Sequence, residues 1–341
     1  MKSALVALIA GSAFVACGGS SPPAQTGGAE PGAASLPEAN PPSTPSPASS
    51  SSPEMAAGMK AFDAGDFAGA RKSFEAATAK DPKNFEAFTN LGLSCEKLGD
   101  AGCAENAYKS ALAAKPGYEG ASEELSAMYL DAGRADDAIA VARAGSAAHP
   151  QNGALHENLG VALAAKGDQD GAVKELTQAS QITPNDAGYQ LTFAHWLNAW
   201  KQRGAVPHLD QARDLAKDDY PMLLSVGFEY RMAGDFEDCV KVFDHLVSTK
   251  DSGEARTERA LCKLGNKDEK GALADLQAAV QVESSYAVAH YYLANRLAIG
   301  KRNKEAAAEY QKYLDLAPSG SLARAAQAHL KDVQDGAGKK K

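Results

Sequence analysis

The sequence predicts an all-α protein made of about eight stacked helical hairpins and a C-terminal capping helix, and three repeating features support this prediction. Prolines recur every 34 residues, at positions 82, 116, 150 and 184. A glycine lies 17 residues before each of them. Between these marks, apolar residues recur at offsets of three, four and seven, which is the spacing of one face of an α-helix. We therefore expect each unit to contain two amphipathic helices, joined by a glycine turn and ended by a proline, which lacks a backbone N–H.

Residues 153–184 show this unit most clearly. Leu159 and Leu163 lie on one face of the expected first helix, and Leu176 lies on the matching face of the second. The small Gly160 stands where two helix backbones could approach closely. This segment is therefore predicted to form a helical hairpin.

The period of 34 residues, the Leu-Gly pairs at 91–92 and 159–160, and the alanine, large apolar residue and proline that follow resemble the tetratricopeptide repeat (TPR). The resemblance extends from about residue 53 to residue 318, although the tryptophan of the motif is replaced throughout. It implies a right-handed superhelical TPR solenoid, which we assign to residues 54–333. In such a solenoid the first helix of each hairpin lines a concave groove.

Residues 1–17 resemble a bacterial lipoprotein signal peptide. Lys2 precedes an apolar run of 12 residues, which is too short to cross a bilayer about 30 Å thick as a helix. The run leads to Ala16-Cys17, and the resemblance implies that Cys17 carries the lipid, including a palmitate, and becomes the new N-terminus. No aspartate follows Cys17, which favours the outer membrane and a periplasmic location. The alternative is an ordinary cleavage site with an incidental cysteine.

Residues 18–53 are rich in proline, serine, alanine and glycine and contain only two charged residues, Glu30 and Glu38. Such a segment cannot bury enough apolar area to offset the entropy of ordering, so we expect it to be disordered. It is either a spacer that holds the repeats away from the bilayer or a linker with no length requirement.

The fifth unit, residues 187–221, departs from the pattern, because the prolines at 184 and 221 lie 37 residues apart. We expect residues 202–207 to replace its turn, with helix resuming near His208. In the seventh unit we expect a turn widened by two residues, at 266–269.

The sequence also predicts the environment of an aromatic stripe and of the C-terminal tail. The first helix of the fifth unit carries an aromatic stripe, which we expect to lie in the core rather than in a ligand site: Tyr189, Phe193, Trp196 and Trp200. Residues 334–341 end in three lysines, and we expect a flexible, solvated basic tail.

Once Cys17 is set aside, an even set of cysteines remains: Cys95, Cys103, Cys239 and Cys262. Cys95 and Cys103, and likewise Cys239 and Cys262, lie on neighbouring antiparallel helices of the expected fold. Each pair could meet the Cα separation of roughly 4.4–6.8 Å that a disulfide requires. An exported chain meets an oxidising compartment, where such bonds persist. The alternative is four small, buried apolar side chains in alanine-like positions.

The charge and the motifs exclude several classes of function. The 341 residues carry a formal net charge of −8 and no clustered basic face, which argues against a nucleic-acid partner. The sequence lacks G-x-S-x-G, G-x-x-x-x-G-K-[ST], H-E-x-x-H and C-x-x-C. We therefore expect no enzyme, no cofactor and no metal site.

The TPR resemblance further implies that groove-facing positions of the first helices bind a partner protein or peptide. Carried over position by position, they are Asn90, Leu93, Lys97, Glu124, Asn158, His195, Phe228, Arg231, Tyr291 and Asn295. Asn90 and Asn158 each precede a Leu-Gly pair, and a side-chain amide can both donate to and accept from the backbone of an extended peptide. Alternatively, each of these polar residues is merely solvated.

Together these features predict a non-enzymatic envelope lipoprotein whose TPR solenoid is a scaffold or adaptor for complex assembly. The complexes considered are those of a secretin or pilus, of motility, or of cell-wall enzymes. One alternative is a periplasmic protein that binds a small ligand or glycan near the aromatic fifth unit. The other is a structural link between membrane and peptidoglycan.

Overall fold

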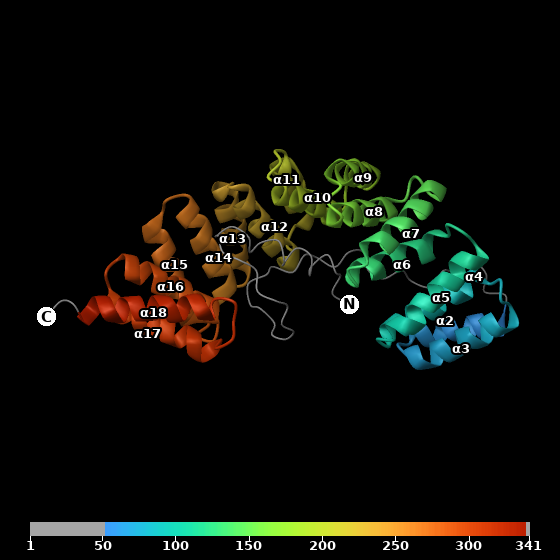
Figure 1. Ribbon diagram of the computed structural model, residues 1–341, viewed down its shortest axis with the longest axis horizontal. Coiled ribbons are helices and arrows are strands. Elements are labelled where there is room, and N and C mark those ends of the chain that lie inside the picture. Colours follow the sequence, from blue (N-terminus) through green and yellow to red (C-terminus); the bar gives the residue numbers. More distant parts are fainter. Residues whose placement is uncertain (1–51, 339–341) are drawn as a thin grey trace. The chain divides into compact units, whose positions relative to one another are not determined.

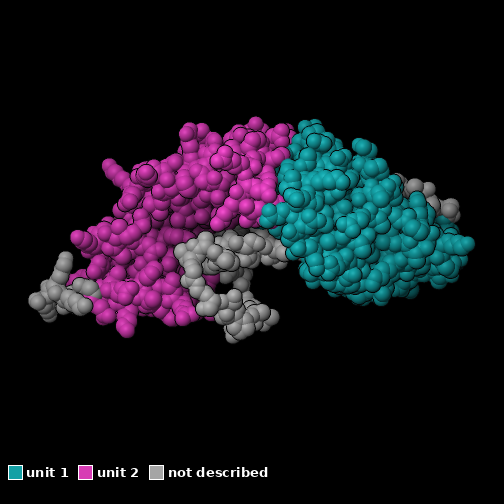
Figure 2. Space-filling view, turned by 45° about the horizontal axis from the view of Figure 1, so that its top comes forward, with its two compact units in different colours: residues 1–13, 38–196 teal, residues 14–37, 197–341 magenta. Residues whose placement is uncertain are grey.

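The structure is a computed structural model that describes residues 52–338, with side chains as far as Asp335. All the regular elements of these residues are α-helices, α2 to α18, so the all-α prediction is confirmed for them (Figure 1). The expected signal peptide and all but the last two residues of the expected linker lie outside the described residues. The chain divides into two compact units, of which the first ends at Trp196 and the second begins at Leu197 (Figure 2).

The first unit consists of helical hairpins in which each helix packs on its neighbour along the chain. The hairpins are α2 (Pro53–Asp63) with α3 (Phe67–Lys80), α4 (Phe85–Lys97) with α5 (Ala101–Ala114), α6 (Glu119–Asp131) with α7 (Ala135–Ala148), and α8 (Gly153–Ala165) with α9 (Gln169–Ile182). Helix α10 (Ala187–Ala199) follows and contains the boundary between the units. The first helix starts one residue earlier than expected, because Ser52 caps it by accepting a hydrogen bond from Met55 N at 3.1 Å.

The second unit repeats this arrangement after α11 (Ala205–Ala216). Its hairpins are α12 (Tyr220–Ala233) with α13 (Phe236–Thr249), α14 (Gly253–Gly265) with α15 (Glu269–Val282), and α16 (Ala287–Ile299) with α17 (Asn303–Leu316). Helix α18 (Ala323–Gly338) packs on α17. With α10 and α11 taken as the fifth hairpin, the expected eight hairpins and final helix are present in the described part of the chain.

The turn between the two helices of a hairpin contains a residue in the left-handed region, which explains the periodic glycines. Gly167 has a φ of 82°, and the backbone N–H of Asp168 then closes the turn on the Leu163 oxygen at 3.0 Å. The Asp168 carboxylate caps α9 by accepting a hydrogen bond from Gly171 N at 3.0 Å. A Gly-Asp pair at this position therefore ends one helix and starts the next.

Three turns use lysine in place of glycine. Lys201, Lys267 and Lys301 have φ values of 54°, 63° and 59°. The turn at Lys267 closes through a hydrogen bond from Asp268 N to the Lys263 oxygen at 2.8 Å, as the glycine turns do. The seventh turn thus has the ordinary length, and the expected widening at 266–269 is wrong.

The fifth hairpin also keeps its turn, at Lys201, and its extra residues follow that turn. Gly204, with a φ of 112°, precedes α11. Helix α11 begins at Ala205 rather than near His208, because Pro207 is tolerated in the first turn of a helix, where its missing N–H is not needed.

The helices of a hairpin approach each other most closely at a small residue of the first helix. A Cβ atom on Gly160 would lie 2.7 Å from Leu176 Cγ, and one on Gly92 would lie 2.4 Å from Tyr108 Cε1. Leu176 and Tyr108 are 1% and 0% exposed. The large side chain of the second helix therefore fills the space that the glycine leaves, as close packing of an interior requires.

The aromatic stripe of α10 lies largely in the interior. Tyr189, Phe193 and Trp196 are each 5% exposed. Trp200 lies one residue beyond the end of α10 and is partly exposed. The first three residues thus have the core position expected for them.

The final helix is longer than the sequence suggested. Helix α18 continues through residues 334–338, which were expected to be part of a flexible tail. No proline follows Pro318 to stop it, and Val333 is buried at 8% exposure, so the helix has a packed face close to its end. Among the described helices, none combines the length and apolar character needed to cross a membrane.

Candidate functional site

The surface formed by the first helices of the hairpins is the candidate site, and the expected residues of the first unit lie on α4, α6, α8 and α10. Helices α6 and α8 pack on each other directly. Of the expected groove residues, Lys97 is exposed and Glu124 and Asn158 are partly exposed. Three others are buried, since Asn90, Leu93 and His195 are 1%, 2% and 6% exposed. The part of this surface open to a partner is therefore smaller than the sequence implied.

The two asparagines of the expected groove differ in their hydrogen bonds. The Asn158 amide nitrogen donates to the Glu123 backbone oxygen at 3.2 Å and to Ser126 Oγ at 2.9 Å. It therefore joins α8 to α6. The Asn90 amide nitrogen is buried and has no hydrogen-bond partner among the described residues. The shared position in the repeat thus gives one residue that ties two hairpins together and one that does not.

Five carboxylates on the first helices of the first unit have raised pKa values, and those of Glu96, Glu123 and Glu157 are raised the most. Burial, with the neighbouring charge of Glu124, raises the pKa of Glu96 to about 8. Burial also raises the pKa values of Glu123 and Glu157 to about 7. Glu123 accepts a hydrogen bond from the neutral Asn152 amide. Glu157 is 6% exposed, so only the partly exposed Glu96 and Glu123 of these three can meet a ligand. A cation close to a desolvated carboxylate stabilises its charged form.

Charge is unevenly divided between the two sets of helices in the first unit. The first helices, α2, α4, α6 and α8, carry nine carboxylates and two cationic side chains. The second helices, α3, α5, α7 and α9, carry six of each. In the second unit, α12, α14 and α16 carry three carboxylates and five cationic side chains. The acidic surface is therefore a property of the first unit and of its first helices.

In the second unit, the expected site residues Phe228, Arg231 and Asn295 remain partly exposed. The Arg231 guanidinium lies 4.8 Å from the centre of the Phe228 ring, and its Nε lies 3.2 Å from Glu258 Oε2. Glu258 is 7% exposed, and burial raises its pKa despite the nearby Arg231. This ion pair links the first helices of two successive hairpins, α12 and α14.

Tyr291 packs into the core of the second unit, whereas Asn295 is partly exposed and bonds to the second helix of its hairpin. Tyr291 is 7% exposed and its ring stacks on that of His329 from α18, with 6.2 Å between centres. Asn295 Oδ1 accepts a hydrogen bond from the Tyr310 hydroxyl at 2.6 Å. The final helix thus covers the face of α16 that would otherwise present Tyr291.

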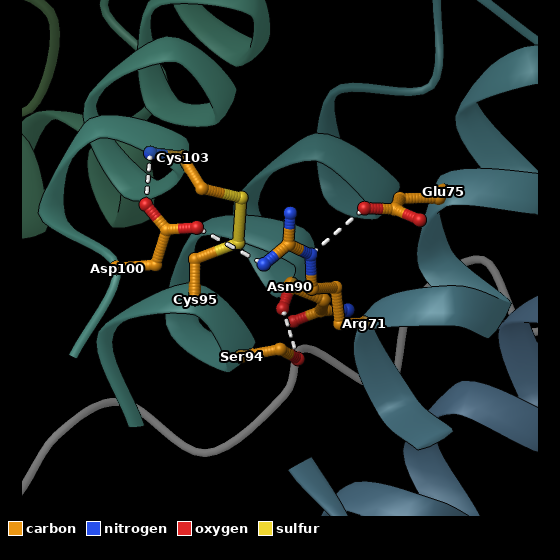
Figure 3. The surroundings of a disulfide bond; sticks show 7 residues. All are labelled: Arg71, Glu75, Asn90, Ser94, Cys95, Asp100 and Cys103. Atoms are coloured by element: carbon orange, nitrogen blue, oxygen red, sulfur yellow. Dashed lines mark hydrogen bonds and ion pairs between the residues drawn. A yellow bond between two sulfur atoms is a disulfide. The ribbon is translucent and has the colours of Figure 1, made fainter. Parts of the chain in front are cut away.

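The four cysteines of the described residues lie in two disulfides. Cys95 and Cys103, whose Cα atoms are 5.7 Å apart, lie on either side of the turn between α4 and α5 (Figure 3). Cys239 and Cys262, at 5.8 Å, join α13 to α14 and so connect two successive hairpins. Both pairings are the ones considered from the sequence, whereas Cys17 lies outside the described residues. No group of three or more potential metal ligands occurs in residues 52–338.

A family model described as the tetratricopeptide repeat matches residues 55–119, 129–187 and 259–321, which together are more than half of the chain. The chain belongs to the tetratricopeptide repeat family. The stretches outside the match include α10 to α13, where the fifth TPR hairpin has its additional residues.

Solved structures share the TPR fold of this chain at low sequence identity. A tetratricopeptide repeat protein from Parabacteroides merdae has a TM-score of 0.51 and 17% identity, over 72% of this chain and 97% of that one. Yeast Tom70 has a TM-score of 0.51 and 15% identity, over 87% of this chain and 67% of that one. A chain of the APC/C hetero-tetramer Cut9-Hcn1 has a TM-score of 0.49 and 16% identity, over 83% of this chain, which spans only 56% of that one. No curated protein matches the sequence significantly.

Two carboxylates of the TPR surface were missed by the sequence reasoning. Glu96 lies beside Lys97, which was selected, and its importance comes from its burial. Glu258 is the sixth residue of α14, and Asn90, Glu124 and Asn158 are the sixth residues of their own helices. This register was a signal that could have identified Glu258.

Proposed function

We propose that this TPR chain is a non-enzymatic scaffold, and that the acidic first-helix surface of its first unit binds a basic segment of a partner protein. The observation that supports the proposal is the uneven division of ionisable groups, with nine carboxyl groups and two cations on the first helices and six of each on the second. Glu86 and Glu157 are buried, so seven of the nine are exposed or partly exposed. An excess of one sign on one face attracts a partner of the other sign and selects against partners of the same sign.

We further propose that the scaffold acts in the assembly of a cell-envelope complex and is anchored to the outer membrane, on its periplasmic side, by lipid on Cys17. This part rests on the sequence, since Cys17 lies outside the described residues. Its test is metabolic labelling with palmitate followed by membrane fractionation of the protein and of Cys17→Ala. Label and membrane association that survive in the variant would contradict the anchor and leave the binding surface unaffected.

The binding surface can be tested with one pair of substitutions and a matched control in the same hairpin. Glu123→Gln with Glu124→Gln removes two carboxyl groups from α6, and Asp136→Asn with Asp137→Asn removes two from α7. Both pairs are adjacent in sequence, and each substitution preserves side-chain size. The probe is a fluorescent peptide of alternating lysine and serine, compared with one of alternating glutamate and serine, and binding is measured by anisotropy.

We expect the lysine peptide to bind, and added salt to weaken its binding. The α6 pair should weaken it about 2- to 30-fold, because exposed or half-exposed charge pairs contribute about 0.2–1 kcal/mol each. The α7 pair should change it less than about two-fold, since those carboxylates lie on second helices. Equal losses in both variants, or equal binding of the glutamate peptide, would contradict the proposed surface.

A further inference from the structure

The two disulfides differ in the accessibility of their cysteines. Cys95, Cys239 and Cys262 are each 0% exposed, whereas Cys103 is partly exposed. Cys103 is the third residue of α5 and so lies in the first turn after the hairpin turn. One disulfide thus includes a partly exposed cysteine, and both cysteines of the other are fully buried.

The hairpin that contains Cys95 and Cys103 has other contacts that hold its turn. The Asp100 backbone N–H donates to the Cys95 oxygen at 2.9 Å, and the Asp100 carboxylate accepts a hydrogen bond from Cys103 N at 3.0 Å. Arg71 Nη1 from the preceding hairpin donates to the same carboxylate at 3.0 Å, while its Nε donates to Glu75 at 2.8 Å (Figure 3). These bonds hold both sides of the turn without the sulfur–sulfur link.

The second disulfide lies in different surroundings. Cys239 Sγ is 3.3 Å from the backbone oxygen of Gly227, and a Cβ on Gly227 would lie 2.6 Å from Phe243 Cε2. The disulfide is therefore close to the tightest contact of the α12–α13 hairpin, and it also ties that hairpin to α14. A thiol can reach it only if these helices first separate.

We propose that Cys95–Cys103 is a thiol–disulfide exchange site in the folded protein, attacked at Cys103 Sγ, and that Cys239–Cys262 is closed to exchange. The attacking thiolate forms a bond to Cys103 Sγ, the sulfur–sulfur bond breaks, and Cys95 leaves as a thiolate that takes up a proton. A second thiol of the same dithiol then attacks its own sulfur in the mixed disulfide and releases Cys103. The dithiol is oxidised by two electrons to a disulfide, and its two protons end on Cys95 and Cys103.

The choice of Cys103 rather than Cys95 follows from access. Exchange rates depend on which sulfur can be approached along the sulfur–sulfur axis. The fully buried Cys95 offers no such approach. The co-reactant is therefore a thiol, either a small molecule or the exposed cysteine of a dithiol oxidoreductase.

The test uses the full-length protein with its disulfides formed. The folded protein is incubated with dithiothreitol, samples are quenched with an alkylating reagent, and peptide mass spectrometry follows each cysteine with time. We expect Cys95 and Cys103 to be alkylated at least about ten-fold faster than Cys239 and Cys262, because the latter require local opening. In guanidinium chloride the two rates should converge, which would show that the fold causes the difference.

A second measurement identifies the sulfur that is attacked. Brief treatment with glutathione should leave the mixed disulfide on Cys103. A glutathione adduct on Cys95, similar rates for the two disulfides in the folded protein, or free thiols at all four positions before treatment would each overturn the proposal. All three results are independent of whether the acidic surface binds a peptide.

Discussion

Replacing Gly92 by alanine adds one methyl group where α4 and α5 come closest. The new Cβ would lie 2.4 Å from Tyr108 Cε1 and 2.7 Å from Cδ1 and Cζ. Tyr108 is 0% exposed, so its ring has no open space into which it could move. Overpacking of this kind costs about 1–3 kcal/mol of unfolding free energy. The better helix propensity of alanine offsets about 1 kcal/mol of it, so we expect a net loss of up to about 2 kcal/mol.

Gly102→Ala is a matched control in the same hairpin. Gly102 lies in the first turn of α5, and the nearest atom to an added Cβ is Asp100 Oδ1 at 3.9 Å. This variant should gain up to about 1 kcal/mol from helix propensity and lose nothing to overpacking. Because the propensity effect is common to both variants, their difference of about 1–3 kcal/mol isolates the steric effect.

The assay is urea unfolding followed by circular dichroism at constant pH with the disulfides oxidised. A change in midpoint with an unchanged slope reports stability rather than a change in the unfolded state. The reasoning is refuted if Gly92→Ala is as stable as Gly102→Ala, since the close approach to Tyr108 would then impose no cost.

Two further predictions concern the disulfides and pH. Cys239→Ala with Cys262→Ala should lower the free energy of unfolding by about 3.4 kcal/mol, and Cys95→Ala with Cys103→Ala should lower it by about 2.5 kcal/mol. The first pair is 23 residues apart in sequence and the second pair 8, and the longer loop constrains the unfolded chain more. Denaturant titration measures both losses, and the reverse order would contradict the loop-length argument. The raised pKa of Glu96, about 8 against an ordinary 4.5, means that the folded protein binds the extra proton between these values. Its contribution to stability is present below pH 4.5 and is lost as the pH rises through about 8. Unfolding of Glu96→Gln across this range should depend less on pH than that of the parent protein, and an unchanged dependence would argue against the burial of this carboxyl group.

The local sequence predicts the hairpin turns that contain glycine but not those that contain lysine. A Gly-Asp pair predicts its turn correctly, because only glycine enters the left-handed region at little cost and aspartate caps the next helix. Lys267 and Lys301 adopt the same conformation although it is unfavourable for a residue with a Cβ. In both turns the next backbone N–H closes on the end of the preceding helix, at the Lys263 and Leu297 oxygens, as it does after the turn glycines. The lysine itself does not signal this conformation.

The candidate site shows a different limit. The repeat register places every expected groove residue on the first helix of a hairpin, as the family resemblance implied. These helices are α4, α6, α8, α10, α12 and α16. It does not tell which of them remain open. Tyr291 is covered because His329 of α18 stacks on it, and Asn158 is occupied because Ser126 on the preceding first helix accepts its hydrogen bond.

The sequence by itself determined the hairpin, its length and the number of copies. These depend on interactions within about one repeat, namely the 3.6-residue period, the turn glycines and the prolines that end the second helices. Only the tertiary structure decided which carboxylates are desolvated, which asparagine is engaged and which cysteine is accessible. Those properties depend on burial, and the burial of a side chain is set by neighbours from other hairpins whose contacts are not encoded in its own repeat.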